Sequence, residues 1–192
     1  MLSELEAVNT MLSVVGQSPV SSLSGAISPD VELAKHVLRS TTKAVLLRGF
    51  NFNREERKLA PDDDGKIRIP EGTLQIDLDP NETSMTRDYK ITHRGDYLYN
   101  RKGNTYVFSK SVPVVLTMDL EWRYIPEVCR KYVEARASRI FGERLDADML
   151  RQRSAQESEF NALAALQAHE LEDSDFTMMA DFNSQYITRR GL

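Results

Sequence analysis

The chain has little cysteine, no long apolar run and no signal-peptide pattern. The single cysteine, Cys129, excludes an internal disulfide and supplies no zinc-ligand spacing, so we expect a chain that folds in a reducing cytosol. No stretch approaches the ~20 apolar residues that span a bilayer. Residues 1–15 carry Glu4 and Glu6 within a helical period instead of the basic flank and apolar core of a signal peptide. The sequence therefore predicts neither membrane insertion nor export by a signal peptide.

An excess of basic residues is also missing. The 192 residues contain 25 Lys and Arg against 29 Asp and Glu, which gives a formal net charge of -4. Proteins that grip phosphates do so with clustered Lys and Arg, and the sequence shows no concentrated cluster of this kind. With 41% hydrophobic residues, the chain is long enough to bury a substantial core in one domain, or in one domain with an insertion.

Local metal and cofactor motifs are absent from the sequence. The three histidines, His36, His93 and His169, lie in three different segments and form no metal-binding motif. The acidic stretches at 61–66 and 77–82 lack the ligand and glycine pattern of a calcium loop, so we interpret them as turns. No glycine-rich phosphate loop is present. We expect no metal and no cofactor.

Catalytic residues are equally hard to find. A nucleophilic Cys129 would need a positioned base and an oxyanion site, which its helical surroundings do not indicate. Adjacent carboxylates occur at 55–56, 62–64 and at Asp119 and Glu121, but glycoside hydrolysis needs two carboxyl groups that face each other across a cleft. A charged, solvated surface explains these residues more simply, and we expect no catalytic residue.

The first predicted helix begins after Ser3 and ends at Gly16, and Pro19 prevents its continuation. Ser3 and Glu6 fit a capping box. Asn9 falls on the polar side. Steps of three and four residues place the apolar side chains on one face, which is built to be covered. This face comprises Leu5, Val8, Leu12 and Val15.

A second helix is predicted to start at Pro29, with Ser28 as its N-cap, and to end at Gly49. Its core-facing side chains are Val31, Ala34, Val37, Leu38, Val45 and Leu46.

The pattern changes at residue 51 to short alternating runs broken by Gly, Pro, Asn and Asp, which is typical of antiparallel strands. Strands are predicted at 66–69, 73–78, 88–93, 96–100, 105–108 and 113–120. The clearest hairpin pairs Tyr97 and Tyr99 with Tyr106 and Phe108 around a Lys-Gly-Asn turn.

Helices return after Pro126. One is predicted to run to Gly142, and a longer one from Asp146 to about Glu172, with a polar middle and apolar ends. The apolar ends of the long helix comprise Met149, Leu150, Phe160, Leu163 and Leu166. The remaining tail, 173–192, shows no period but carries apolar and aromatic side chains, which predicts that a partner covers it. The candidate partner contacts are Phe176, Met179, Phe182, Tyr186, Arg189 and Arg190.

Together these elements predict an α+β fold, with a helical bundle built from N-terminal and C-terminal helices and a central antiparallel β insertion. We assign the helical body to 1–50 and 121–172, the insertion to 51–120 and the tail to 173–192.

Three segments, "ELEAVNTMLSVVGQSPVSSL", "RGFNFN" and "IPEVCRKYVEARASRIF", occur in this order around the β-rich stretch. Over most of residues 3–145 the chain thereby resembles the tail tubular protein A family of short-tailed bacteriophages. The motif positions are Leu5, Val8, Leu12, Gly16, Pro19, Gly49, Phe50, Phe52, Pro126 and Phe141.

The resemblance implies a structural protein of the virion, assembled in the host cytoplasm. It implies a dodecameric ring that acts as an adaptor between the portal protein and a tail nozzle protein of the tail tubular B type. DNA would pass through the central channel without specific binding, and mild acidity suits such a channel. Two other classes stay open: a tail-associated glycan hydrolase that uses paired carboxylates, and a DNA-binding module with a basic face.

Overall fold

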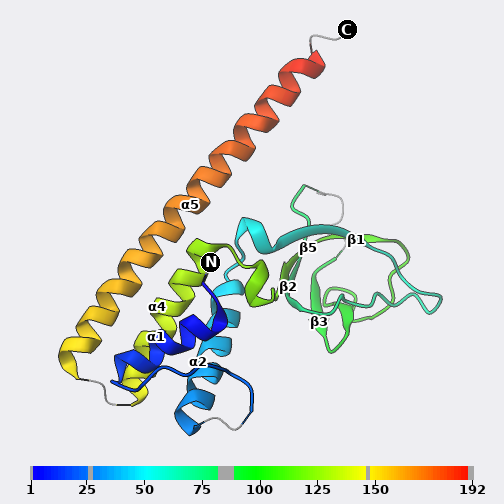
Figure 1. The fold of residues 1–192 in the computed structure, drawn as a ribbon. Helices are drawn as coiled ribbons and strands as arrows, with labels where there is room; N and C mark the ends of the chain where they lie inside the picture. The colour runs from blue at the N-terminus through cyan, green and yellow to red at the C-terminus, as the bar shows by residue number, and fades with distance from the viewer. Residues whose placement is uncertain (1, 26–27, 82–88, 146–147, 190–192) are drawn as a thin grey trace. The chain divides into compact units, whose positions relative to one another are not determined.

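The computed structural model describes residues 2–25, 28–81, 89–145 and 148–189, with side chains as far as residue 173. It is a mixed α+β structure, as predicted (Figure 1). The chain divides into two compact units, one formed by Met1–Thr42 with Glu121–Leu192 and the other by Lys43–Leu120. We call them the helical unit and the β unit.

Helix α1 (Glu4–Val14) opens the helical unit with the predicted capping box. The Ser3 hydroxyl accepts the Glu6 N–H at 3.1 Å, and the Glu6 carboxylate accepts the Ser3 N–H at 2.7 Å. Gly16 ends the helix at φ +77°, where a Cβ would lie 2.8 Å from a nitrogen of Arg151. The prediction of a glycine stop is confirmed, and Pro19 follows in an exposed position.

The buried face of α1 is wider than predicted. Val8 and Leu12 are fully buried, whereas Leu5 is half-buried. Ala7 and Met11, which the apolar spacing did not single out, are also fully buried.

Asn9 was expected on a free polar surface, and this expectation is wrong. Its amide group donates to the Val20 carbonyl at 3.0 Å and accepts the Val20 N–H at 2.8 Å. The side chain thus replaces a missing backbone partner and fastens the segment after Gly16 to the helix.

Helix α2 (Pro29–Leu46) has the predicted N-terminal cap, because the Ser28 hydroxyl accepts the Val31 N–H at 3.4 Å. All six predicted core residues are buried. Gly49, at φ +72°, lies in the left-handed region just after the helix. The Thr42 hydroxyl donates to the Leu38 carbonyl at 2.8 Å, which satisfies a buried polar group within the helix.

Within the motif "RGFNFN", the side chain of Asn53 links the beginning and the end of the β unit. Its amide nitrogen donates to the carbonyls of Leu46 and Met118, both at 2.9 Å, and its amide oxygen accepts the Phe50 N–H at 2.8 Å. Phe50 and Phe52 stack with their ring centroids 5.4 Å apart. Asn53 is buried, so its three bonds join the end of α2 to the end of the last strand in a dry environment.

Three antiparallel strands form the main sheet, in the order β1 (Arg54–Leu59), β5 (Val112–Met118) and β2 (Thr73–Leu78). Arg54 faces Thr117 across one pair, and Ile76 faces Leu116 across the other. The predicted strand at 73–78 is confirmed, and β1 was not predicted. The core of the β unit comprises Ile67, Ile69, Ile76, Ile91, Leu98, Phe108, Val112, Val114 and Leu116.

A second sheet pairs β3 (Ile91–Arg94) with β4 (Tyr97–Asn100). The turn between them contains Gly95 at φ +62°. The predicted hairpin of 97–100 with 105–108 is confirmed only at its turn, where Asn100 and Thr105 exchange both backbone hydrogen bonds, and no continuous strand follows. Residues 66–69 and 105–108 contribute only isolated bridges, which are Lys66 to Val107, Arg68 to Tyr97 and Asn100 to Thr105.

Helix α4 (Glu127–Arg144) begins after Pro126, as predicted, but does not end at Gly142. Gly142 is buried within the last turn beside the fully buried Phe141. The buried Arg130 of α4 donates to the Leu2 carbonyl at 2.9 Å, which ties the chain start to this helix. Helices α1 and α5 (Met149–Arg189) both pack against α4.

Candidate functional site

The inner side of α5 packs on α4 with a partly buried ion pair. Ala155 and Leu166 are buried along this side. Between them, Glu159 accepts hydrogen bonds from Arg139 and, at 3.3 Å, from Arg136. The polar middle of α5 thus contacts α4 through Ala155 and Glu159, while most of its other residues are exposed.

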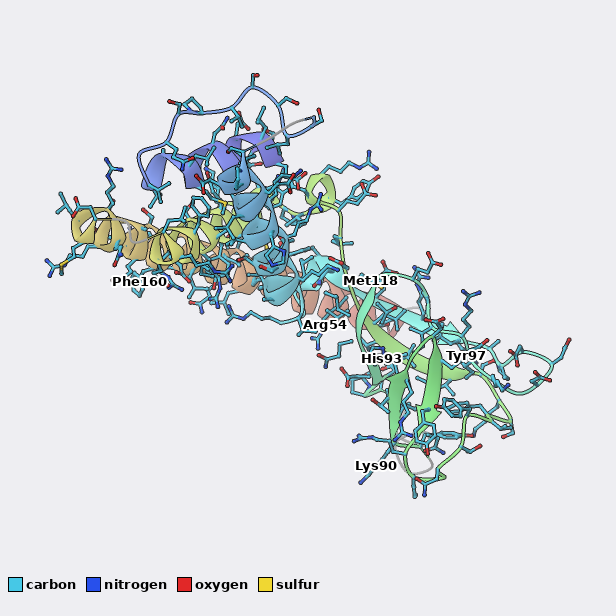
Figure 2. The ribbon with its side chains drawn as sticks, turned by 90° about the horizontal axis from the view of Figure 1, so that it is seen from below. Arg54, Lys90, His93, Tyr97, Met118 and Phe160 are labelled. Carbon is cyan, nitrogen blue, oxygen red and sulfur yellow. The ribbon has the colours of Figure 1, made fainter. Side chains whose placement is uncertain are left out.

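The outer side of α5 exposes large apolar residues. The exposed fractions are 71% for Met149, 75% for Leu150, 71% for Phe160 and 68% for Leu171. Of the predicted apolar ends of this helix, Met149, Leu150 and Phe160 are exposed, Leu163 is half-buried and Leu166 is buried. Phe160 is labelled on α5 in Figure 2.

Three of these exposed residues form a line along the helix. Met149, Phe160 and Leu171 are separated by eleven residues each, close to three full turns of ~3.6 residues. We call this row of three the outer stripe of α5. At ~1.5 Å per residue it extends over roughly 33 Å. Successive members lie roughly 16 Å apart along the helix, so they are separate exposed side chains and not one contiguous apolar patch.

The predicted partner contacts of the tail lie beyond this stripe. The backbone of α5 continues as helix to Arg189, so the expected end near Glu172 is wrong. The side chains of Phe176, Met179, Phe182, Tyr186 and Arg189, and the whole of Arg190, are outside the described part of the chain. Their role as partner contacts stays a prediction.

Comparison with known proteins shows the family of the chain. The sequence model of the family described as "Tail tubular protein" matches residues 5–176. The chain belongs to the tail tubular protein family. It is similar to "Tail tubular protein A" of Klebsiella phage KP34, with 28% identity over 132 residues, which cover 69% of this chain and 67% of the relative.

Membership in the tail tubular family makes the chain a structural component of a bacteriophage tail. The match begins in α1 and ends within α5, so it includes both units and the outer stripe. None of the described helices combines the length and the apolarity required to cross a bilayer.

A polar groove of about 530 Å³ lies between α1, α4 and α5 of the helical unit. Burial raises the pKa of its carboxyl group, Glu134, and a hydrogen bond from Thr10 offsets part of that rise. Ser138 also lines the groove, and its buried hydroxyl has no hydrogen-bond partner among the described residues. Glu134 is the only carboxylate among the described residues that line this groove.

Two carboxylates do share a smaller groove of about 360 Å³ in the β unit, where Glu71 and Asp96 lie with His93. The carboxyl group with a raised pKa, Glu134, belongs to the other groove and the other unit. Among the described residues that line these two grooves, no second carboxylate faces Glu134, as a glycan hydrolase requires.

Cys129 is fully buried in α4. Burial raises the pKa of its thiol to about 12, and the nearby Glu170 carboxylate adds to the rise. A protonated, inaccessible thiol is no nucleophile, which agrees with the expectation from the sequence.

Sequence reasoning missed a group formed by His169, Glu170 and Asp173 on α5. One potential ligand atom from each lies within 4.8 Å of the others, and His169 Nδ1 is 3.5 Å from a carboxylate oxygen of Asp173. The i, i+4 spacing of His169 and Asp173 could have revealed the pair. Such ion pairs are common on helix surfaces, and this one carries no metal assignment.

Sequence reasoning also missed one grouping of cations. The β3–β4 hairpin brings together cations that lie up to eleven residues apart, together with tyrosines that separate them. A count restricted to residues 89–110 could have found it, because that stretch holds five Lys or Arg and one carboxylate, Asp96.

Proposed function

We propose that this tail tubular family member is the ring-forming adaptor of a short bacteriophage tail, placed between the portal and the tail nozzle. Twelve copies would surround a channel through which DNA leaves the head. The observation that carries the proposal is the family match over residues 5–176. The exposed side chains of Met149, Phe160 and Leu171 on α5 are the candidate contacts with a neighbouring subunit or the portal.

The helical unit is suited to rigid contact with neighbours. The Glu159 pair holds α5 along α4, and the bonds of Leu2 hold the chain start to α4. A partner that binds the outer stripe therefore meets a surface whose backbone is already ordered, so that less entropy is lost on binding.

The test is the association state of the full chain, measured by sedimentation and native mass spectrometry over rising concentration, alone and with the portal protein of the same phage. We expect a ring or a portal complex. Phe160→Glu with Leu171→Glu should weaken association at least tenfold, because two charges would have to be desolvated. Asn161→Glu with Ala165→Glu is the matched control, since it adds two charges at exposed positions on another side of the same helix.

A monomer in the presence of portal at high concentration would contradict the adaptor proposal. Equal association of the control and the stripe variant would show that α5 presents a different face to its partners. Cryo-electron microscopy of the complex then gives the number of copies.

A further inference from the structure

The outward face of the β3–β4 hairpin collects cations and tyrosines. Arg94 faces Tyr97 and Thr92 faces Tyr99 in the antiparallel register. Opposed residues share one face of a sheet, and so do residues two apart along a strand, so these four lie on the same side. Leu98, between the two tyrosines, is fully buried in the core.

Neighbouring backbone extends this face on both sides. Arg68 is bridged to Tyr97 and is exposed. At the other end, the Arg101 N–H donates to the Lys90 carbonyl at 2.7 Å, so these two exposed residues continue the ladder by one step. Because side chains along a strand alternate between its two faces, Lys90 and Arg101 project on the same side as Arg94. Figure 2 shows Lys90 and Tyr97 near opposite ends of the hairpin.

Tyrosine rings occupy the space between the cations. The guanidinium carbon of Arg94 lies 3.8 Å from the centroid of the Tyr99 ring, and Tyr106 meets Tyr99 edge to face at 4.8 Å. Tyr99 is buried beneath them. Tyr97 and Tyr106 retain exposed fractions of 37% and 38%. We call this surface the cationic tyrosine face, formed by Arg68, Lys90, Arg94, Tyr97, Tyr99, Arg101 and Tyr106.

The cations of the face have little local compensation. None of its four cations forms an ion pair within 4.0 Å of a carboxylate in the described part of the chain. Asp96 in the turn and Glu71 line the same groove as Arg68 and are the acidic groups beside it. In a chain of net charge -4, four such cations on one face create a local positive potential.

We propose that the cationic tyrosine face binds a nucleic acid through its phosphate backbone. Guanidinium and ammonium groups neutralise phosphates, and exposed tyrosine rings stack on unpaired bases. An acidic protein would match the charge but would not present planar bases to Tyr97 and Tyr106. Adjacent strands are ~4.8 Å apart and alternate residues ~6.8 Å apart, so the cations span a distance comparable to several backbone phosphates. The proposal goes beyond the adaptor function and does not depend on ring formation.

The experiment measures binding of the full chain to fluorescent single-stranded and duplex oligonucleotides by anisotropy at several salt concentrations. If all four cations contact phosphates, the logarithm of the affinity should fall with the logarithm of salt with a slope of about -3.6 for duplex and about -2.8 for single strands. Lys90→Ala with Arg101→Ala should reduce the duplex slope by about 1.8. This pair leaves the stack of Arg94 on Tyr99 in place.

Tyr97→Ala separates the two substrates. We expect affinity for the single strand to fall roughly 5- to 150-fold, with little change for duplex, because only unpaired bases can stack on the ring. Arg48→Ala with Lys58→Ala is the control, since it removes two exposed cations elsewhere in the β unit. Thermal melts of every variant confirm that it is folded.

Three results would overturn the proposal. The first is no binding of either oligonucleotide at about 50 mM salt, where phosphate contacts are strong. The second is an equal loss in the face variant and in the control. The third is displacement of the oligonucleotide by polyglutamate of matched charge as effectively as by unlabelled DNA, which would assign the face to an acidic protein.

Discussion

At the scale of single residues, Asn9 shows how one amide can replace a turn. It satisfies both the N–H and the carbonyl of Val20, which lies eleven residues further along the chain. Asn9→Ala should reduce the free energy of unfolding by about 1–3 kcal/mol, because two partly buried backbone groups lose their partners. Ser13→Ala, at an exposed position of the same helix, should change it by less than about 0.5 kcal/mol. Urea denaturation measures both, and equal values would show that the Val20 contact contributes nothing.

A substitution at Leu12 tests more severely which face of α1 is buried. It is fully buried, so Leu12→Asp places an unpaired carboxylate in the core, at a cost of several kcal/mol against a total stability of ~5–15 kcal/mol. We expect circular dichroism melts to show loss of the helical unit. Ser13→Asp adds the same charge one residue further along and should melt close to the native chain. A native-like melt for Leu12→Asp would place another face of α1 inward.

The buried thiol of Cys129 makes the free energy of unfolding depend on pH. The folded-state pKa of its thiol is about 12, above the ordinary value of 9.0. Between these values the unfolded chain releases the proton and the folded chain keeps it, so the contribution is fully present below pH 9 and is lost as the pH rises toward 12. From pH 8 to pH 10 the native chain should lose about 1.4 kcal/mol more than Cys129→Ala.

Urea denaturation of both chains at the two pH values checks this difference. The native thiol should also resist alkylation at pH 8 until the chain unfolds. Rapid labelling of the folded protein would show that the thiol is accessible and the burial argument wrong.

At the scale of elements, the C-terminal part of α5 is separable from the fold. The described contacts that hold α5 to α4, through Ala155, Glu159 and Leu166, all precede Glu172. Truncation after Glu172 should therefore leave the thermal melt nearly unchanged while it weakens binding to the portal. A chain that ends at Glu157 is the control, because it loses Glu159 and Leu166 and should melt lower. If the chain that ends at Glu172 unfolds, residues 173–192 belong to the core.

Helix caps and periodic apolar residues were the features that the sequence predicted best. Ser3, Gly16, Ser28 and Gly49 act locally, so their roles follow from neighbouring residues alone. The predicted helix end at Gly142 was wrong because a glycine also fits where helices pack closely. Gly142 is buried in α4 and does not adopt a left-handed conformation.

Strand β1 and the second sheet required tertiary information. Five of the six residues in "REERKL" are charged, which suits an edge strand whose partner β5 supplies the apolar residues. The Lys-Gly-Asn turn closes only a single bridge between Asn100 and Thr105, whereas the longer pairing of β3 with β4 is set by the tight turn at Gly95 and by burial of Ile91 and Leu98. The apolar residues at the ends of α5 divide between exposed and buried positions, because spacing alone does not reveal which side a neighbour covers.

At the scale of the whole molecule, the two units contain separate cores. Leu98 is fully buried in the β unit, as Leu12 is in the helical unit. Leu98→Asp should abolish hydrogen-exchange protection in β3 and β5 and leave α1 and α4 protected, whereas Leu12→Asp should do the reverse. Hydrogen exchange read by mass spectrometry resolves the units. Loss of protection throughout the chain in both variants would mean a single cooperative unit.

Asn53 has a consequence for how such a chain can change over evolution. Because one amide group touches both the carbonyl of Leu46 and that of Met118, the two ends of the β unit lie next to each other. A segment whose entry and exit are adjacent can be lengthened, shortened or exchanged without altering the distance that the flanking chain must span. The β unit can thus be exchanged as a whole. Recombination at these two points of the gene would give the protein a new surface and leave its helical unit unchanged.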